Sequence, residues 1–245
     1  RDLVRSRGLG DVYKRQVLSS SLTQYSDYMK SAKKSSSKDG AAMVTRVGKK
    51  IAAATEQYLR NNGLESEIKN FAWEFNLVND PQVNAFCMPG GKIVVYEGLM
   101  QLVSSDDELA VVVGHEVAHA VAKHSNERMS QQLMAQYGAQ ILGQALSNKS
   151  AAVQKIGASV YGLGAQYGVM LPFSRKHESE ADYMGLVFMA MAGYNPAVAV
   201  NFWQKMSAGK SGSTPEFMST HPSDATRINE IKQHLPEIEK YRVKK

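Results

Sequence analysis

The most constraining feature of the sequence is an apolar helix that carries three polar side chains. Residues 109–121 are almost entirely small or apolar apart from His115, Glu116 and His119, and a capping box at 105–108 predicts that a helix begins just before them. A helix that is apolar on all sides is buried. Buried histidines and glutamates are costly unless something binds them. The chain must therefore fold around this helix and supply partners for the three side chains.

The spacing of these residues is typical of a zinc site. His115 and His119 are four positions apart, which places them about 40° apart on one helix face. Two imidazoles so arranged can take adjacent corners of a zinc tetrahedron, and Glu116 can reach a water there as a general base without binding the metal. The alternative is a chance H-E-x-x-H pattern whose histidines are hydrogen-bonded in the core. The third histidine of metzincins is excluded because Ser125 stands at that position.

A second predicted helix, with its start signals at 172–174, offers the missing ligand. It contains H-E-S-E-A-D at 177–182, in which Glu178 and Asp182 are four residues apart and share a face. Glu178 can ligate the metal while Asp182 orients a ligating histidine. The alternative is a solvated acidic face, which the presence of the histidine helix disfavours.

The remaining pattern predicts an α+β fold, mostly helical with one small sheet. Three short runs have the alternating or apolar character of strands: 71–77, 83–88 and 92–96. Helical spacing and boundary signals fall at 43–59, 174–192, 196–206 and 222–235, with a loop at 208–219. Strands followed by helices are the order of an α+β domain, and we expect the three strands to be antiparallel.

Three segments are expected along the chain. Residues 1–16 have no apolar periodicity and indicate a non-native leader, 17–40 a polar helix and linker, and 41–245 the domain that holds the zinc site. Residues 138–171 contain six glycines and only two charged side chains. They indicate either closely packed helices or a lid or membrane-surface hairpin.

Composition excludes several classes of protein. The net charge of +6 is no nucleic-acid signature, because residues 1–16 alone carry five basic and two acidic residues and no basic stripe with aromatics follows. The single cysteine, Cys87, cannot form an intramolecular disulfide and is interpreted as a packing residue. The sequence contains no run of about 18 apolar residues, so no membrane span is expected.

Several motifs together resemble a known enzyme family. They are H-E-V-A-H at 115–119, S-R-K-H-E-S-E-A-D at 174–182, T-H-P-S-D-A-T-R at 220–227, N-A-F-C-M-P-G-G at 84–91 and A-G-Y-N-P at 192–196. In this order, over residues 41–235, the chain is similar to the gluzincin zinc metallopeptidases that include the CAAX-prenyl endopeptidase, HtpX and Oma-type proteases. Among these it most resembles the soluble periplasmic LoiP- and BepA-like members, although no tetratricopeptide repeats follow the domain.

The resemblance implies a role for each site residue. One zinc ion per chain would be bound by His115, His119 and Glu178, with Glu116 as base and acid, while Asp182 would support a ligand histidine. His221 is implied either to occupy the fourth zinc position at rest or to bind the transition state, and Arg227 to help stabilise the oxyanion.

The resemblance also implies a substrate and a place in the cell. Gluzincins hold substrate as an added strand, for which Asn84, Ala85 and Phe86 are the expected sheet edge; a plain core strand is the alternative. The expected activity is cleavage of unfolded or misassembled envelope proteins by a periplasmic precursor, lipid-anchored or secreted. The alternative is an envelope chaperone with latent protease activity gated by His221. The oligomeric state stays open.

Overall fold

The computed structural model describes residues 15, 18–19, 21–124, 173–208 and 215–243. Two compact units are distinguished, Arg1–Ser31 with Lys123–Leu171, and Ala32–Ala122 with Pro172–Lys245. In the first, residues 21–31 are helical, as expected for part of 17–40. The interpretation of 1–16 as a leader lies outside the described residues except at residue 15, and that of 138–171 lies wholly outside them. Among the described residues, no helix has both the length and the apolar character that crossing a bilayer requires.

The second unit contains a three-stranded mixed sheet. Its strands β1 (Glu74–Val78), β2 (Ala85–Met88) and β3 (Lys92–Tyr96) lie in the order β1-β3-β2. The expected antiparallel arrangement is correct for β2 and β3 but wrong for β1 and β3, which are parallel. The reason is that residues 79–84 form a connection too long for a tight hairpin, so β2 does not pair with β1. The chain crosses to the far edge of the sheet to form β2, and β3 then forms between β2 and β1. All five residues of β3 are buried, which suits the central position.

The two edges of this sheet are in different situations. At the end of β1, Ser35 N donates to Leu77 O (2.9 Å) and Asn79 N donates to Lys33 O (2.8 Å), so the segment 33–35 adds to that edge. On the other side, β2 has no further strand beyond it among the described residues. The strand expected to receive substrate is therefore an edge strand.

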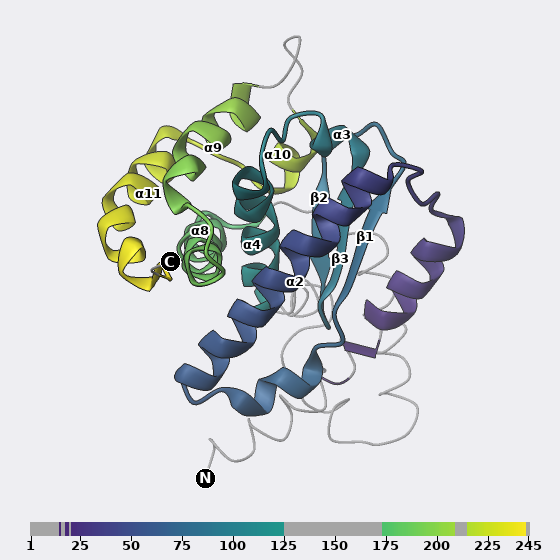
Figure 1. The fold of residues 1–245 in the computed structure, drawn as a ribbon, viewed down its shortest axis with the longest axis horizontal. Coiled ribbons are helices and arrows are strands. Elements are labelled where there is room, and N and C mark those ends of the chain that lie inside the picture. Colours follow the sequence, from purple (N-terminus) through teal and green to yellow (C-terminus); the bar gives the residue numbers. More distant parts are fainter. Residues whose placement is uncertain (1–14, 16–17, 20, 125–172, 209–214, 244–245) are drawn as a thin grey trace, which may run out of the picture. The chain divides into compact units, whose positions relative to one another are not determined.

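Two long helices pack beside the sheet. Helix α2 (Lys38–Asn61) begins after Ser37, whose hydroxyl accepts from Gly40 N, so it starts inside the expected linker. Helix α4 (Asp106–Ala122) begins as predicted, because Glu108 N donates to the Ser105 hydroxyl (3.2 Å). Figure 1 shows α2 crossing the sheet and α4 lying between β2 and α8. The short helices η1 (Glu65–Asn70) and α3 (Glu97–Met100) connect these elements.

The C-terminal part of the unit is helical. Its elements are α8 (Arg175–Met191), η2 (Pro196–Val198), α9 (Ala199–Ala208), α10 (Glu216–Thr220), α11 (Ala225–Ile238) and η3 (Glu239–Tyr241). Ser174 caps α8 by accepting from His177 N, as the sequence predicts. The expected loop at 208–219 is wrong at its end, where α10 forms, and α11 begins three residues later than expected because Asp224 is its cap.

Helices α4 and α8 touch through their backbones. A Cβ atom on Gly185 would lie 2.7 Å from His115 N, and one on Gly114 would lie 2.7 Å from Gly185 O. Only glycine at both positions allows this approach. The contact fixes how far the helix with the histidines lies from the helix with Glu178.

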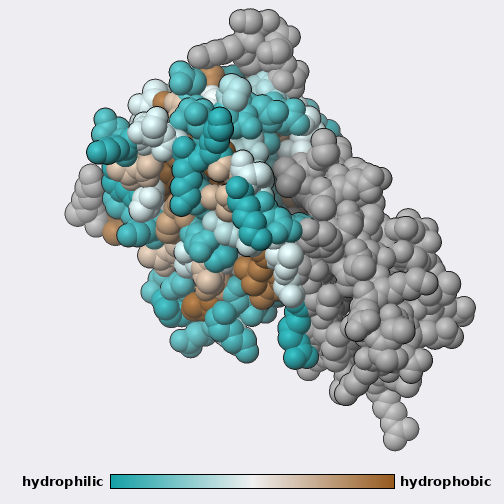
Figure 2. All heavy atoms as spheres, turned by 90° about the vertical axis from the view of Figure 1, so that its right-hand side faces the viewer, coloured by the Kyte–Doolittle hydropathy of each residue, from teal (hydrophilic) through white to brown (hydrophobic). Residues whose placement is uncertain are grey.

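The core of the unit lies where α4, α8 and the sheet meet, and α4 is buried from Leu109 to His119. On the face drawn in Figure 2, hydrophilic residues prevail over the described part, and hydrophobic residues form small separate patches. The histidines buried in α4 have partners within this unit, Glu178 and Asp182 of α8.

Candidate metal centre

The two motif histidines share one buried face of α4. His115 and His119 are almost wholly buried, and their Nε2 atoms lie 3.1 Å apart. This confirms the geometry that the four-residue spacing predicts. Both rings present Nε2 to the same small space.

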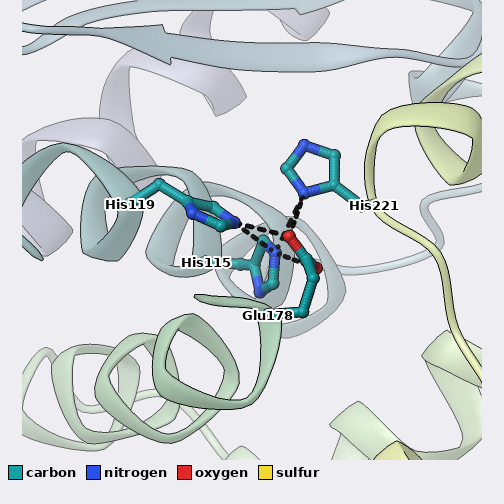
Figure 3. Close-up of side chains that lie close together, drawn as sticks. All are labelled: His115, His119, Glu178 and His221. Carbon is teal, nitrogen blue, oxygen red and sulfur yellow. Dashed lines mark hydrogen bonds and ion pairs between the residues drawn. The ribbon is translucent and has the colours of Figure 1, made fainter. Parts of the chain in front are cut away.

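Glu178 completes a three-residue cluster from α8. Its side chain is fully buried, with Oε2 3.0 Å from His115 Nε2 and Oε1 2.8 Å from His119 Nε2. Figure 3 shows its carboxylate directed at the imidazoles. The two helices that the sequence pairs by pattern therefore meet at these side chains.

His221 adds a fourth group from the C-terminal end of α10. Its Nδ1 lies 2.8 Å from Glu178 Oε1 and 3.3 Å from His115 Nε2, and its Nε2 lies 3.0 Å from Glu116 Oε1. Ligand atoms of His115, His119, Glu178 and His221 all lie within 4.8 Å of one another. The Nδ1 atom of His221 therefore lies within ligand distance of the centre, while its Nε2 atom contacts Glu116, the expected base.

The cluster has the dimensions of a zinc site. Nitrogen and oxygen ligands at zinc-bond distance on a tetrahedron lie about 3.3 Å apart, close to the distances within the cluster. Glu178 Oε2 is buried without a well-aligned hydrogen-bond partner, as expected of an atom arranged for a cation. Three imidazoles and one carboxylate suit Zn²⁺ by donor type. The residues present therefore fit the ion that the motif predicts.

The electrostatics also favour a cation. Burial alone lowers the pKa of His115, but Glu178 and Asp182 outweigh it and raise that pKa to about 9. Burial lowers the pKa of His119 well below its usual value. Burial alone raises the pKa of Glu178, but the charges of His115 and His221 outweigh it and hold that pKa well below its usual range. A metal ion held by these residues would take the place of the proton on His115.

Two further residues support the ligands from behind. Asp182 Oδ1 lies 3.0 Å from His115 Nδ1, on the side of the ring opposite to Nε2. Arg227 binds the Asp182 carboxylate with Nε at 2.5 Å and Nη2 at 2.9 Å, and its Nη1 lies 3.1 Å from Glu178 Oε2. Asp182 thus lies at the expected distance from a ligand histidine, although the two atoms are not well aligned for a hydrogen bond, and Arg227 contacts the carboxylates of Asp182 and Glu178.

Comparison with known proteins places the chain in a family. Residues 45–235, most of the chain, match the family described as Peptidase family M48. The chain belongs to this family. Its motif helix, Glu178 and the His221 segment all lie within the matched residues.

Three curated relatives of the chain are peptidases by name. The chain is 36% identical over 205 residues to the mitochondrial metalloendopeptidase OMA1 of Schizosaccharomyces pombe, covering 80% of this chain and 53% of that protein. It is 40% identical over 168 residues to the OMA1 of Arabidopsis thaliana, covering 69% and 33%. It is 33% identical over 174 residues to the beta-barrel assembly-enhancing protease of Yersinia pestis, covering 66% and 36%. The chain thus spans between a third and about half of these relatives.

The M48 motifs do not reveal three aromatic rings that pack on the imidazoles. Phe217 stacks on His221 with centroids 4.2 Å apart, and Phe173 stacks on His119 at 4.0 Å. Trp203 meets His115 edge to face at 5.2 Å. The only sequence signal is that Phe173 directly precedes the motif at 174–182 and Phe217 stands three residues before the motif at 220–227, whereas the sequence around Trp203 indicates an ordinary core residue.

The expected substrate edge lies along β2, which contacts α4. Asn84 is buried; its side chain accepts from Ala85 N (2.9 Å) and its carbonyl accepts from Tyr96 N (3.1 Å). Because an antiparallel ladder alternates, the backbone groups of Ala85 and Cys87 point away from β3. Phe86 is partly buried. Burial raises the pKa of the Cys87 thiol, which agrees with a packing role.

Proposed function

We propose that this chain is a zinc-dependent endopeptidase. The observation that carries the proposal is the buried, tetrahedron-sized cluster of His115, His119 and Glu178 with Glu116 beside it. Membership of the M48 family and the names of the relatives support the same activity. One ion per chain fits the cluster.

Each residue then has a chemical task. Zinc at this site supplies a Lewis acid that polarises a peptide carbonyl and lowers the pKa of a water. Glu116 takes the proton of the attacking water and delivers it to the leaving amine. His221 Nε2, 3.0 Å from Glu116 Oε1, is placed to donate to the developing oxyanion once it turns from the carboxylate.

The proposed substrates are extended polypeptide segments that add to β2. Ala85 O and the backbone groups of Cys87 supply hydrogen bonds that do not depend on substrate sequence, while Ala85 N is engaged by the Asn84 side chain, and Asn84 and Phe86 flank these groups. Such recognition suits unfolded chains. The name of the Yersinia pestis relative refers to β-barrel assembly, which supports an envelope location and misassembled envelope proteins as substrates. Neither nucleic acid nor a membrane span is part of this proposal.

Cleavage of an unfolded protein tests the proposal. We expect casein to be cleaved, activity to disappear after dialysis against a zinc chelator, and addition of about one equivalent of zinc to restore it, because the ligand set needs the ion to activate water. Gel analysis of cleavage and elemental analysis of zinc measure this. Activity that persists in the zinc-free protein would contradict the proposal.

A second candidate function is that of a chaperone whose peptidase activity is latent. The observation that favours it is that His221 lies within ligand distance and is held there: Phe217 N donates to Val83 O (2.9 Å) and Phe173 N donates to Thr220 O (3.0 Å), so both ends of α10 are fixed. His221 in the fourth position would exclude the water that Glu116 needs.

Replacing His221 with alanine distinguishes the two functions. If His221 blocks the centre in nine molecules of ten, the H221A variant cleaves casein about tenfold faster, because the competent fraction rises to unity. If His221 binds the transition state instead, the rate falls. Initial rates at equal zinc occupancy decide this, with His234→Ala as a control on α11.

A further inference from the structure

Arg227 carries a permanent positive charge in direct contact with the carboxylates of Asp182 and Glu178, and these contacts engage its whole guanidinium. Its side chain is only 3% exposed, and Nε and Nη2 bind the two oxygens of Asp182 as a fork. The guanidinium also lies 5.1 Å over the ring of Trp203. A side chain held in this way has little freedom to move toward a substrate.

The other end of the guanidinium is also engaged. Nη1 donates to Pro222 O (2.7 Å), lies 3.1 Å from Glu178 Oε2 and reaches His221 O at 3.4 Å. An oxyanion would therefore compete with three oxygens that are already in place. The contacts show a residue that serves the ligands themselves.

We propose that Arg227 is a positioning residue that sets the affinity and geometry of the zinc site through Asp182 and Glu178. This rests on the proposed function and assigns Arg227 no contact with the substrate. Through Asp182 it fixes the ring of His115, through Nη1 it fixes Glu178, and through two carbonyl groups it fixes the turn that carries His221.

The charges support the same assignment. Glu178 and Asp182 are two buried carboxylates, and Arg227 supplies a permanent positive charge between them. Removing it leaves Asp182 buried without its partner, which is strongly unfavourable. Asp182 is then free to turn from His115, and the zinc ligands lose their orientation. We therefore expect zinc affinity to be the first property that changes.

Zinc affinity measured by competition with a chromophoric chelator tests the proposal on the full chain. For Arg227→Met we expect affinity to fall about 10–100-fold, with kcat recovering to within a few-fold of wild type at saturating zinc. Arg227→Lys keeps the charge but loses the forked contact with Asp182. Its zinc affinity should therefore lie between those of wild type and Arg227→Met. Asp182→Asn should lower zinc affinity by a similar factor. The variant that combines Arg227→Met with Asp182→Asn should bind zinc only slightly more weakly than either single variant, because both residues act through one contact.

The matched control is Arg46, which forms the same fork with Asp106 at an exposed site (2.7 and 2.8 Å). Arg46→Met should leave zinc affinity unchanged. Unchanged affinity in Arg227→Met or Arg227→Lys, with kcat lowered at full zinc occupancy, would overturn the proposal and assign Arg227 to the oxyanion. If Arg227→Met does not fold by circular dichroism, the lysine and Asp182→Asn variants decide. Wild-type protein that binds no zinc would instead refute the proposed function.

Discussion

Replacing Glu116 with glutamine is expected to lower the rate of peptide cleavage about 10²–10⁴-fold while zinc stays bound. The amide has nearly the shape of the carboxylate but cannot take a proton from water. The substitution leaves the zinc ligands His115, His119 and Glu178 in place, and the contact that joins Glu116 to the cluster is with His221 Nε2. The loss should therefore be in kcat.

Casein cleavage and bound zinc, measured on the same samples, check this expectation. Glu180→Gln is the matched control, because Glu180 is an exposed glutamate on α8 close in sequence to Glu178. It should retain full activity. An E116Q variant that cleaves at the wild-type rate would remove Glu116 from the mechanism, and one that has lost zinc would make it a ligand.

Replacing Gly185 with alanine is expected to damage the metal centre from a distance. The added Cβ would lie 2.7 Å from His115 N and 2.8 Å from the carbonyl carbon of Gly114, so α4 and α8 must separate. Overpacking of this kind lowers the free energy of unfolding by about 1–3 kcal/mol. The shift also moves His115 relative to Glu178, so zinc affinity should fall with stability.

Urea unfolding and zinc competition measure the two effects together. Gly63→Ala is a control for the glycine change itself, since Gly63 has φ of +70° but no atom within 4 Å of a Cβ. It should cost about 1–2 kcal/mol of stability through backbone strain and leave zinc affinity alone. Equal zinc affinity in Gly185→Ala and wild type would show that the helix contact does not set the site.

The parts of the site that follow local rules were predictable from the sequence. The spacing of His115 and His119, and of Glu178 and Asp182, fixes each pair on one helix face, and the structure places both pairs as expected. The capping signals at 105 and 174 located both helix starts. These features depend on residues within one or two turns of each other.

The parts that depend on distant contacts were not predictable. The parallel pairing of β1 with β3 follows from where the chain crosses the sheet, which alternation does not encode. Helix α10 is too short for a periodic pattern, so Phe217 was assigned to a loop. The direction in which the Arg227 side chain points depends on how α11 packs against α8. The motif at 220–227 does not encode that packing.

The wide separation of the ligands along the chain has a consequence for biosynthesis. His115 and His221 are 106 residues apart and Glu178 and His221 are 43 apart, so the centre forms only when distant segments have met. Closing such loops is slow and comes late in folding. A nascent chain that has not yet reached Glu178 has two histidines on one helix and no carboxylate from α8. The proposed catalytic centre therefore cannot assemble until the segment with Glu178 has been made and has packed against α4.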